Sequence, residues 1–184
     1  FHPTLKTNYL GMKTQTSFFT KMILASALIL LVLNVNASNY AEAMGKALQT
    51  LGQAGNTEQL LASADQFERI GKAEQNQWLP YYYGAFACVQ VVMRNSDIPK
   101  NQRESVLERA QSFIEQSMAI QSNESEVYVL QGFIYQLKIS NPMEGASLSM
   151  KATSTLAKAE VLNPENPRVY YAQGTNVLYT PKAF

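Results

Sequence analysis

The feature that most constrains the fold is a short segment that occurs twice, 42 residues apart. Glu126 to Gly132 reads EVYVLQG and Arg168 to Gly174 reads RVYYAQG, so the tyrosines and the glycines fall at matching places. A looser copy, YYYG, ends at Gly84, which lies 48 residues before Gly132. Periods of about 20–50 residues are typical of arrays of small stacked units. We therefore predict a repeat architecture rather than one closed bundle.

The apolar residues recur at helical spacing along most of the chain. Ala41, Met44, Leu48 and Leu51 step by three and four residues, as one face of a helix does. No stretch alternates in the manner of a strand. Short polar links between helices make neighbours antiparallel. We predict an all-α chain with helices over residues 41–51, 57–70, 78–93, 99–120, 123–139, 144–162 and from 166 onward.

Several of the predicted helix starts carry capping signals. Asn123, with Glu126 three residues later, resembles a capping box that opens the fifth helix. Pro99 suits the first turn of the fourth helix, because its missing N–H is not needed there. Asn166 before Pro167 is a candidate N-cap for the seventh helix.

The residues around the repeated glycines resemble the tetratricopeptide-repeat family. In that family the first helix of a repeat carries an aromatic residue four positions before a glycine. The second helix carries small and large apolar residues at set offsets before a proline, which this chain matches with Ala152, Leu156, Ala159 and Pro164. The preceding unit has at the same places Ala110, Ile114, Ser117 and Ser122. The small residues are expected where two helices cross closely.

This resemblance covers residues 78–176 and extends to residues 39–77. In the order of these motifs, the chain resembles secreted tetratricopeptide-like proteins of Bacteroidota. The resemblance implies antiparallel helix-turn-helix repeats stacked as a short right-handed solenoid of six to seven helices. Repeats of the family are about 34 residues long, whereas these are 42 and 48. We expect the extra residues near 95–99 and 139–143, and the last repeat to be incomplete.

The N-terminal region reads as a secretory signal. From Met12, two lysines precede a mostly apolar run of twelve residues, 22–33, within the length of about 7–15 typical of signal peptides. Val35 and Ala37 are small residues at the positions that signal peptidase reads, so the cut is predicted before Ser38. Residues 12–37 are then the signal peptide, and residues 1–11 are an artefact or a disordered tail. An uncleaved anchor and a buried core helix are the alternatives, although a span needs about 20 apolar residues.

Charge and histidine content narrow the function classes. Three of the 15 basic residues and none of the 14 acidic residues lie in the first 37, leaving 12 against 14 beyond them. No basic stripe is visible, which disfavours nucleic-acid binding. The only histidine, His2, lies before the predicted mature chain. Histidine-based triads and most zinc sites are therefore not expected.

The remaining chemical groups also have plain structural interpretations. Cys88 lies in an apolar run, where a buried small hydrophobe is expected rather than a reactive thiol. The carboxylate pairs Glu104/Glu108 and Glu124/Glu126 are interpreted as solvated charges on helix faces. We predict no enzyme, and no cofactor or metal.

The family resemblance implies a groove lined by the first helices of the repeats. By offset from the repeated glycines, the groove-facing residues are expected to be Trp78, Tyr81, Glu126, Val129, Phe133, Gln136, Arg168, Tyr171 and Thr175. The aromatic cluster over residues 78–83 is open to two interpretations. It serves either helix–helix packing or recognition, because Tyr and Trp combine large apolar area with a polar tip.

Three function hypotheses follow. The first is a periplasmic or secreted bacterial scaffold that binds a peptide or a protein partner, with no membrane span after signal cleavage. The second is a structural or assembly component of a cell-envelope complex. The third is a carboxylate-based enzyme, for which a pair of acidic residues would suffice.

Overall fold

The computed structural model describes residues 39–179, apart from the side chains of Pro142, Leu178 and Tyr179. The chain divides into two units, Phe1–Ala43 and Met44–Phe184. Of the first unit, residues 39–43 are described, and they are helical. The signal peptide predicted for residues 12–37 and its cut lie outside the described residues. All that follows concerns the second unit.

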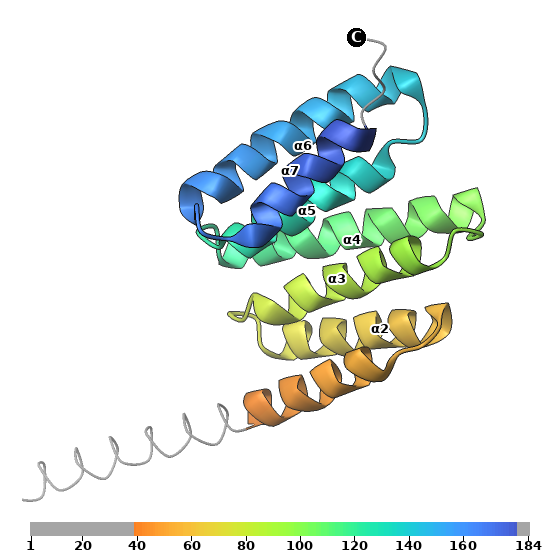
Figure 1. Cartoon of the computed structure of the whole chain (residues 1–184). Helices are drawn as coiled ribbons and strands as arrows, with labels where there is room; N and C mark the ends of the chain where they lie inside the picture. The colour runs from red at the N-terminus through yellow and green to blue at the C-terminus, as the bar shows by residue number, and fades with distance from the viewer. Residues whose placement is uncertain (1–38, 180–184) are drawn as a thin grey trace, which may run out of the picture. The chain divides into compact units, whose positions relative to one another are not determined.

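Within residues 44–179 the chain is built of helices joined by short turns, and no strand occurs there (Figure 1). The all-α prediction is confirmed. Residues 44–53 are helical and precede the first labelled element. The labelled helices are α2 (Thr57–Ala73), α3 (Leu79–Arg94), α4 (Lys100–Ile120), α5 (Ser125–Lys138), α6 (Pro142–Leu162) and α7 (Pro167–Tyr179).

Asparagine side chains cap three of these helices. The Oδ1 atoms of Asn56 and Asn141 each accept a hydrogen bond from the backbone N–H three residues on, at 2.9 and 3.0 Å. The Oδ1 of Asn166 accepts from the N–H of Arg168 at 3.0 Å, so the predicted cap of α7 is confirmed. Each bond satisfies a donor that the first turn of a helix leaves without a partner.

The capping box predicted for Asn123 and Glu126 is wrong. The N-cap of α5 is Glu124, and its side chain makes no capping bond. The Glu124 carboxylate instead accepts from the Gln121 amide at 3.3 Å. The Glu126 carboxylate is occupied by donors from elsewhere in the fold, among them Asn166. Long-range partners thus replace the local pair.

Each helix packs against its neighbours in the chain, and α5 also contacts α3 and α7 (Figure 1). The helices α3, α5 and α7 are the ones that carry the repeated tyrosine and glycine residues. Because α5 contacts both α3 and α7, these three helices form a row. In the chain, α4 follows α3 and α6 follows α5. This row places side chains from three separated segments next to one another.

Two of the repeated glycines lie where helices cross closely. A Cβ atom added to Gly84 of α3 would lie 3.1 Å from the Phe113 ring of α4. A Cβ added to Gly132 of α5 would lie 2.7 Å from Cδ2 of Leu156 in α6. The spacing at Gly132 is closer than real Cβ atoms come, so Leu156 would have to move, and the spacing at Gly84 is tighter than most real Cβ contacts, so Phe113 would have to shift slightly.

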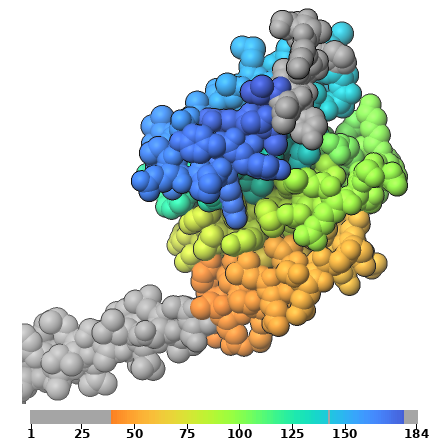
Figure 2. Space-filling view, viewed as in Figure 1, coloured from red at the N-terminus to blue at the C-terminus, as the bar shows by residue number. Residues whose placement is uncertain are grey.

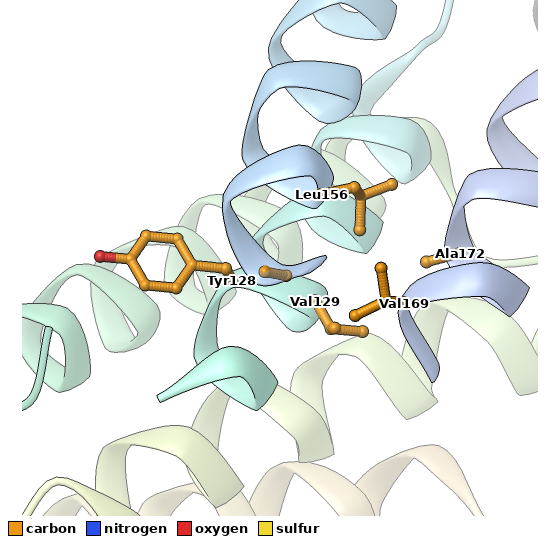
Figure 3. Packing of buried hydrophobic residues seen from close by; sticks show 6 residues of the cluster. Tyr128, Val129, Leu156, Val169 and Ala172 are labelled. Atoms are coloured by element: carbon orange, nitrogen blue, oxygen red, sulfur yellow. The ribbon is translucent and has the colours of Figure 1, made fainter. Parts of the chain in front are cut away.

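The apolar and small residues that the sequence pattern singles out in α4 and α6 are fully buried. Fractional exposure is 0% for all six of Ala110, Ile114, Ser117, Ala152, Leu156 and Ala159. Figure 3 shows Val129, Leu156 and Val169 pointing toward one another from α5, α6 and α7, with Ala172 beside them. Burying an aliphatic side chain of this size contributes about 1.5–3 kcal/mol, so this cluster holds the three helices together.

The long spacing between the repeated glycines is accommodated mainly in the lengths of α4 and α6. Both α4 and α6 are 21 residues long, against 16 for α3 and 14 for α5. Of the residues expected to be extra, 95–99 form the link between α3 and α4, 139–141 lie between α5 and α6, and 142–143 begin α6, which Asn141 caps. Proline suits this first turn because the N–H that it lacks has no helical acceptor.

Candidate functional site

An open hollow of about 220 Å³ runs across α3, α5 and α7. Figure 2 shows the face of the molecule on which α3 and α7 reach the surface. The hollow, called the groove below, is lined by Tyr82, Phe86, Val89, Gln90, Met93, Glu126, Val129, Leu130, Phe133, Arg168 and Tyr171.

Most of the groove wall is apolar. Val89, Val129 and Leu130 are buried at its floor. At the rim, Met93 is 54% exposed and Tyr171 is 62% exposed, although both are large apolar side chains. The Tyr171 ring lies 5.9 Å from the ring of half-buried Phe133, centroid to centroid. Exposed apolar surface around a buried floor is typical of an interaction site.

The groove also has one polar cluster, centred on Glu126. The Tyr82 hydroxyl of α3 donates to Glu126 Oε2 at 3.1 Å, and Arg168 Nη1 of α7 donates to the same oxygen at 2.7 Å. Asn166 Nδ2, at the start of α7, donates to the other oxygen at 2.8 Å. One carboxylate on α5 is therefore held by groups from both α3 and α7.

The electrostatics of this cluster keep Tyr82 protonated and Arg168 charged. Burial raises the pKa of Tyr82 above its ordinary value, and the adjacent Glu126 carboxylate raises it further. Hydrogen bonding to Glu126 and its negative charge raise the pKa of Arg168. Tyr82 is therefore a hydrogen-bond donor at any ordinary pH, and it has no tendency to act as a base.

A buried chain of hydrogen bonds continues behind the polar cluster. Asn166 Nδ2 donates to Ser125 Oγ at 3.1 Å, and that hydroxyl donates to the backbone carbonyl of Ala159 at 2.9 Å. These contacts join the start of α7, the start of α5 and the end of α6. Because the groups are buried, leaving one unpaired would cost about 1–3 kcal/mol.

Five of the nine residues predicted to face a groove line the one observed: Glu126, Val129, Phe133, Arg168 and Tyr171. Glu126 was also interpreted as a solvated charge, and that interpretation is wrong, since its carboxylate has three donors. Trp78 precedes α3 and is half-buried, with its ring 5.8 Å from the ring of Tyr82 in an edge contact. It does not line the groove.

Tyr81 lies on the side of α3 that faces away from the groove. It is 7% exposed, and its ring packs against Gly71 of α2 and Phe113 of α4. Tyr82 lines the groove instead. The prediction assumed that α3 has the same rotation as α5 relative to its glycine. One residue along a helix corresponds to a rotation of about 100°, which moves a side chain from one face to another.

Gln136 and Thr175 join α5 to α7 rather than line the groove. Gln136 Nε2 donates to the backbone carbonyl of Ala172 at 2.8 Å. The Thr175 hydroxyl is 3.0 Å from Gln136 Oε1. Their polar groups are therefore used in fixing the distance between two of the helices that form the groove.

The groove residues that the prediction missed lie mainly on α3. Tyr82, Phe86, Val89 and Met93 are spaced by four, three and four residues, which is one stripe of a helix. This stripe was visible in the sequence as apolar spacing. The spacing alone does not determine whether the stripe faces the core or an open hollow.

The single cysteine offers no reactive group. Cys88 is 0% exposed, and burial raises the pKa of its thiol to about 12. A thiolate is the reactive form, so the interpretation of Cys88 as a buried small hydrophobe is confirmed.

A second charged cluster lies away from the groove, between α2 and α4. Arg109 Nη2 pairs with Asp65 Oδ1 at 2.5 Å and with Glu68 Oε2 at 2.8 Å. Hydrogen bonds from Lys72 and from Arg109 lower the pKa of Glu68. The carboxylates are thus neutralised by cations in their own cluster, which gives the cluster a structural role.

No protein-family model matches the chain, and no curated protein or solved structure matches it. Among the helices of residues 39–179, none is both long and apolar enough to cross a bilayer. The site therefore has to be interpreted from its own geometry.

Proposed function

We propose that this protein is a binding scaffold that accepts a segment of a peptide or protein partner in the groove. The observation that carries the proposal is the apolar rim, where Met93 and Tyr171 are more than half exposed above a buried floor. Large apolar side chains gain free energy when a partner removes them from water. No catalytic role is proposed, because the one carboxylate of the groove is occupied by three donors.

The proposed architecture is a short right-handed solenoid of tetratricopeptide-like repeats. The contacts of α5 with both α3 and α7 support it, since the first helices of successive repeats would touch in such a stack. The close crossings at Gly84 and Gly132 support it as well. In this arrangement α3 with α4 and α5 with α6 are the repeats, and α7 begins a third.

We further propose that the protein is exported to the periplasm or secreted by a bacterium. The support is the lysine-flanked apolar run of residues 22–33 and the small residues before Ser38. N-terminal sequencing of the protein from its native envelope should find Ser38 as the first residue. A chain that retains Met12 or Phe1 would contradict export by cleavage.

The binding proposal is tested by removing the exposed apolar side chains of the groove rim. The double variant M93A/Y171A should lose capture of envelope proteins by the immobilised full chain. The matched control M150A/Y170A removes a methionine and a tyrosine that are 73% and 48% exposed but do not line the groove. Both variants should keep the helicity that circular dichroism measures, since exposed side chains contribute little to the core.

Two outcomes would contradict binding through the groove. One is capture that survives in M93A/Y171A. The other is equal loss of capture in the control, which would place the contact outside the groove.

A second candidate is an assembly component of an envelope complex. Large apolar side chains are exposed outside the groove on α6 and α7, including Met143 at 92%, Val161 at 83% and Val177 at 73%. Such surface is expected at contacts between subunits. Under this alternative the purified chain forms defined oligomers by analytical ultracentrifugation, and V161D together with V177D returns it to a monomer.

A further inference from the structure

We propose that the segment bound in the groove carries one large apolar side chain and, one or two residues from it, a carboxylate that pairs with Arg168. This inference rests on the proposed function, and it specifies the chemistry of the partner. Three observations carry it: the size of the groove, the occupancy of Glu126 and the free edge of the Arg168 guanidinium.

The size of the groove suits a single bulky side chain. Pockets for whole small-molecule ligands have volumes of about 300–1,000 Å³. An apolar cavity of about 150 Å³ holds a benzene molecule. At about 220 Å³, the groove has room for one aromatic or branched aliphatic side chain. Its open form leaves the rest of the partner outside.

The lining favours an apolar side chain that need not have one specific shape. Phe86, Phe133 and Tyr171 supply aromatic surface, and Val129 supplies the floor. Met93, at the rim, has three rotatable bonds and a polarisable sulfur, so it adapts to different side chains. The anchor is therefore defined by its bulk and apolarity.

The polar cluster favours a negatively charged group over a positive one. The Glu126 carboxylate already accepts bonds from Tyr82, Arg168 and Asn166, so it has little left to offer a cation. The hydrogen bonds that Arg168 donates from its side chain within the described residues all use Nη1. Its side chain is 63% exposed. The Nε and Nη2 edge donates no hydrogen bond within the described residues, and its planar fork matches a carboxylate bidentately.

The positions of Arg168 and Tyr171 set the spacing between anchor and carboxylate. The two residues are three apart on α7, which is about 4.5 Å along the helix axis. An extended peptide advances about 3.3 Å per residue. The carboxylate of the partner thus lies one or two residues from the anchor in the groove.

The test measures the affinity of the full chain for short fluorescein-labelled peptides by fluorescence anisotropy. The probe has the sequence Gly-Ser-Phe-Ser-Asp-Gly, with amidated C-terminus. Three comparison peptides replace its Phe by Ala, its Asp by Asn, or its Asp by Lys. We expect binding of the probe to weaken about tenfold or more with Ala, since burial of a large side chain is lost. The peptide with lysine in place of aspartate should bind about tenfold more weakly than the probe. The peptide with asparagine there should have an intermediate affinity.

Variants of the chain separate the two halves of the inference. R168Q should abolish the preference for aspartate over lysine but keep the preference for phenylalanine over alanine. R168K, which retains the charge but not the planar fork, should keep part of the preference for aspartate. The matched control R69Q removes an exposed arginine of α2 and should change neither preference. Circular dichroism of each variant checks that the helices are intact.

Each other outcome overturns a defined part of the proposal. If phenylalanine peptides bind regardless of charge and R168Q changes nothing, the carboxylate pairing is wrong while peptide binding in the groove stands. If lysine is preferred, the charge assignment is wrong. If no peptide binds, or if M93A/Y171A binds the probe as well as the natural chain does, the groove is not the binding site. Self-association of the chain that M93A/Y171A abolishes would identify a second copy as the occupant.

Discussion

At the scale of single residues, one missing methyl group sets how closely two helices approach. Gly132 leaves no room for a Cβ atom, because Leu156 would lie 2.7 Å from it. Gly174 holds the same place in the repeated segment, yet nothing lies within 4 Å of a Cβ built there. The same motif residue is therefore a packing requirement in α5 and an exposed helix residue without close neighbours in α7.

These two glycines give a matched pair of substitutions. G132A should lower the free energy of unfolding by about 1–3 kcal/mol, since the added methyl overpacks the α5–α6 crossing. G174A should raise it by up to about 1 kcal/mol, because alanine is the better helix former. Urea denaturation followed by circular dichroism measures both. Equal effects of the two substitutions would contradict the close crossing at Gly132.

At the scale of elements, α7 is held by a few specific contacts. Val169 and Ala172 are buried against α5 and α6, and Gln136 bonds the carbonyl of Ala172. Glu126 adds the contact to Arg168 and, through Asn166, to the start of the helix. Because α7 also supplies a wall of the groove, its attachment determines whether the groove exists.

Removing Glu126 should therefore loosen α7 before it affects the rest of the molecule. In E126A the buried amide of Asn166 keeps its bond to Ser125 but loses the one to Glu126, and the hydroxyl of Tyr82 loses its acceptor, at a cost of about 1–3 kcal/mol. Amide hydrogen exchange in residues 167–179 should become faster, with α4 nearly unchanged. The control E104A removes the Glu104 carboxylate, whose side chain is 56% exposed and pairs with Lys100. It should leave amide hydrogen exchange in residues 167–179 unchanged. Uniform acceleration in all helices would contradict a local role.

At the scale of the molecule, contacts run mainly between helices that are near in sequence. Helix α2 packs mainly against α3, with ion pairs from Arg109 of α4 to Asp65 and Glu68, whereas α6 packs against α5 and α7. In the repeat array that we propose, stability is expected to be close to a sum of local terms and nearest-neighbour terms. A defect at one end should therefore propagate only weakly to the other.

Two core truncations test this local character. F67A in α2 and L156A in α6 each remove a side chain that is 0% exposed, and each should cost about 2–5 kcal/mol. Hydrogen exchange should accelerate mainly in α2 and α3 for F67A, and mainly in α5, α6 and α7 for L156A. If both variants accelerate exchange equally everywhere, residues 44–179 unfold as one cooperative unit.

Much of the helical layout was predictable from local patterns. The predicted segments over residues 57–70 and 144–162 differ from α2 and α6 by no more than three residues at either end. Helix spacing and asparagine caps are local properties, because they depend on residues within one or two turns. The capping box at Asn123 failed for the opposite reason, since distant donors took the Glu126 carboxylate.

The candidate site was predictable only where helix rotation could be inferred. Glu126, Val129 and Phe133 line the groove as expected, since α5 has the rotation that the repeat implied. For α3 the inference was displaced by one residue, which exchanged Tyr81 for Tyr82. A periodic pattern identifies an apolar stripe, but the neighbours of a helix determine which part of the stripe they cover.

By itself, the sequence determined that residues 44–179 are helical, where the helices begin, and which small residues lie at their crossings. Those properties follow from spacing within one segment and from side-chain size. The tertiary structure alone decided that Tyr82, Glu126 and Arg168 meet, although they are far apart in the chain. It also decided that the stripe on α3 stays partly open. Both depend on how three helices rotate against one another, which is set by packing among them.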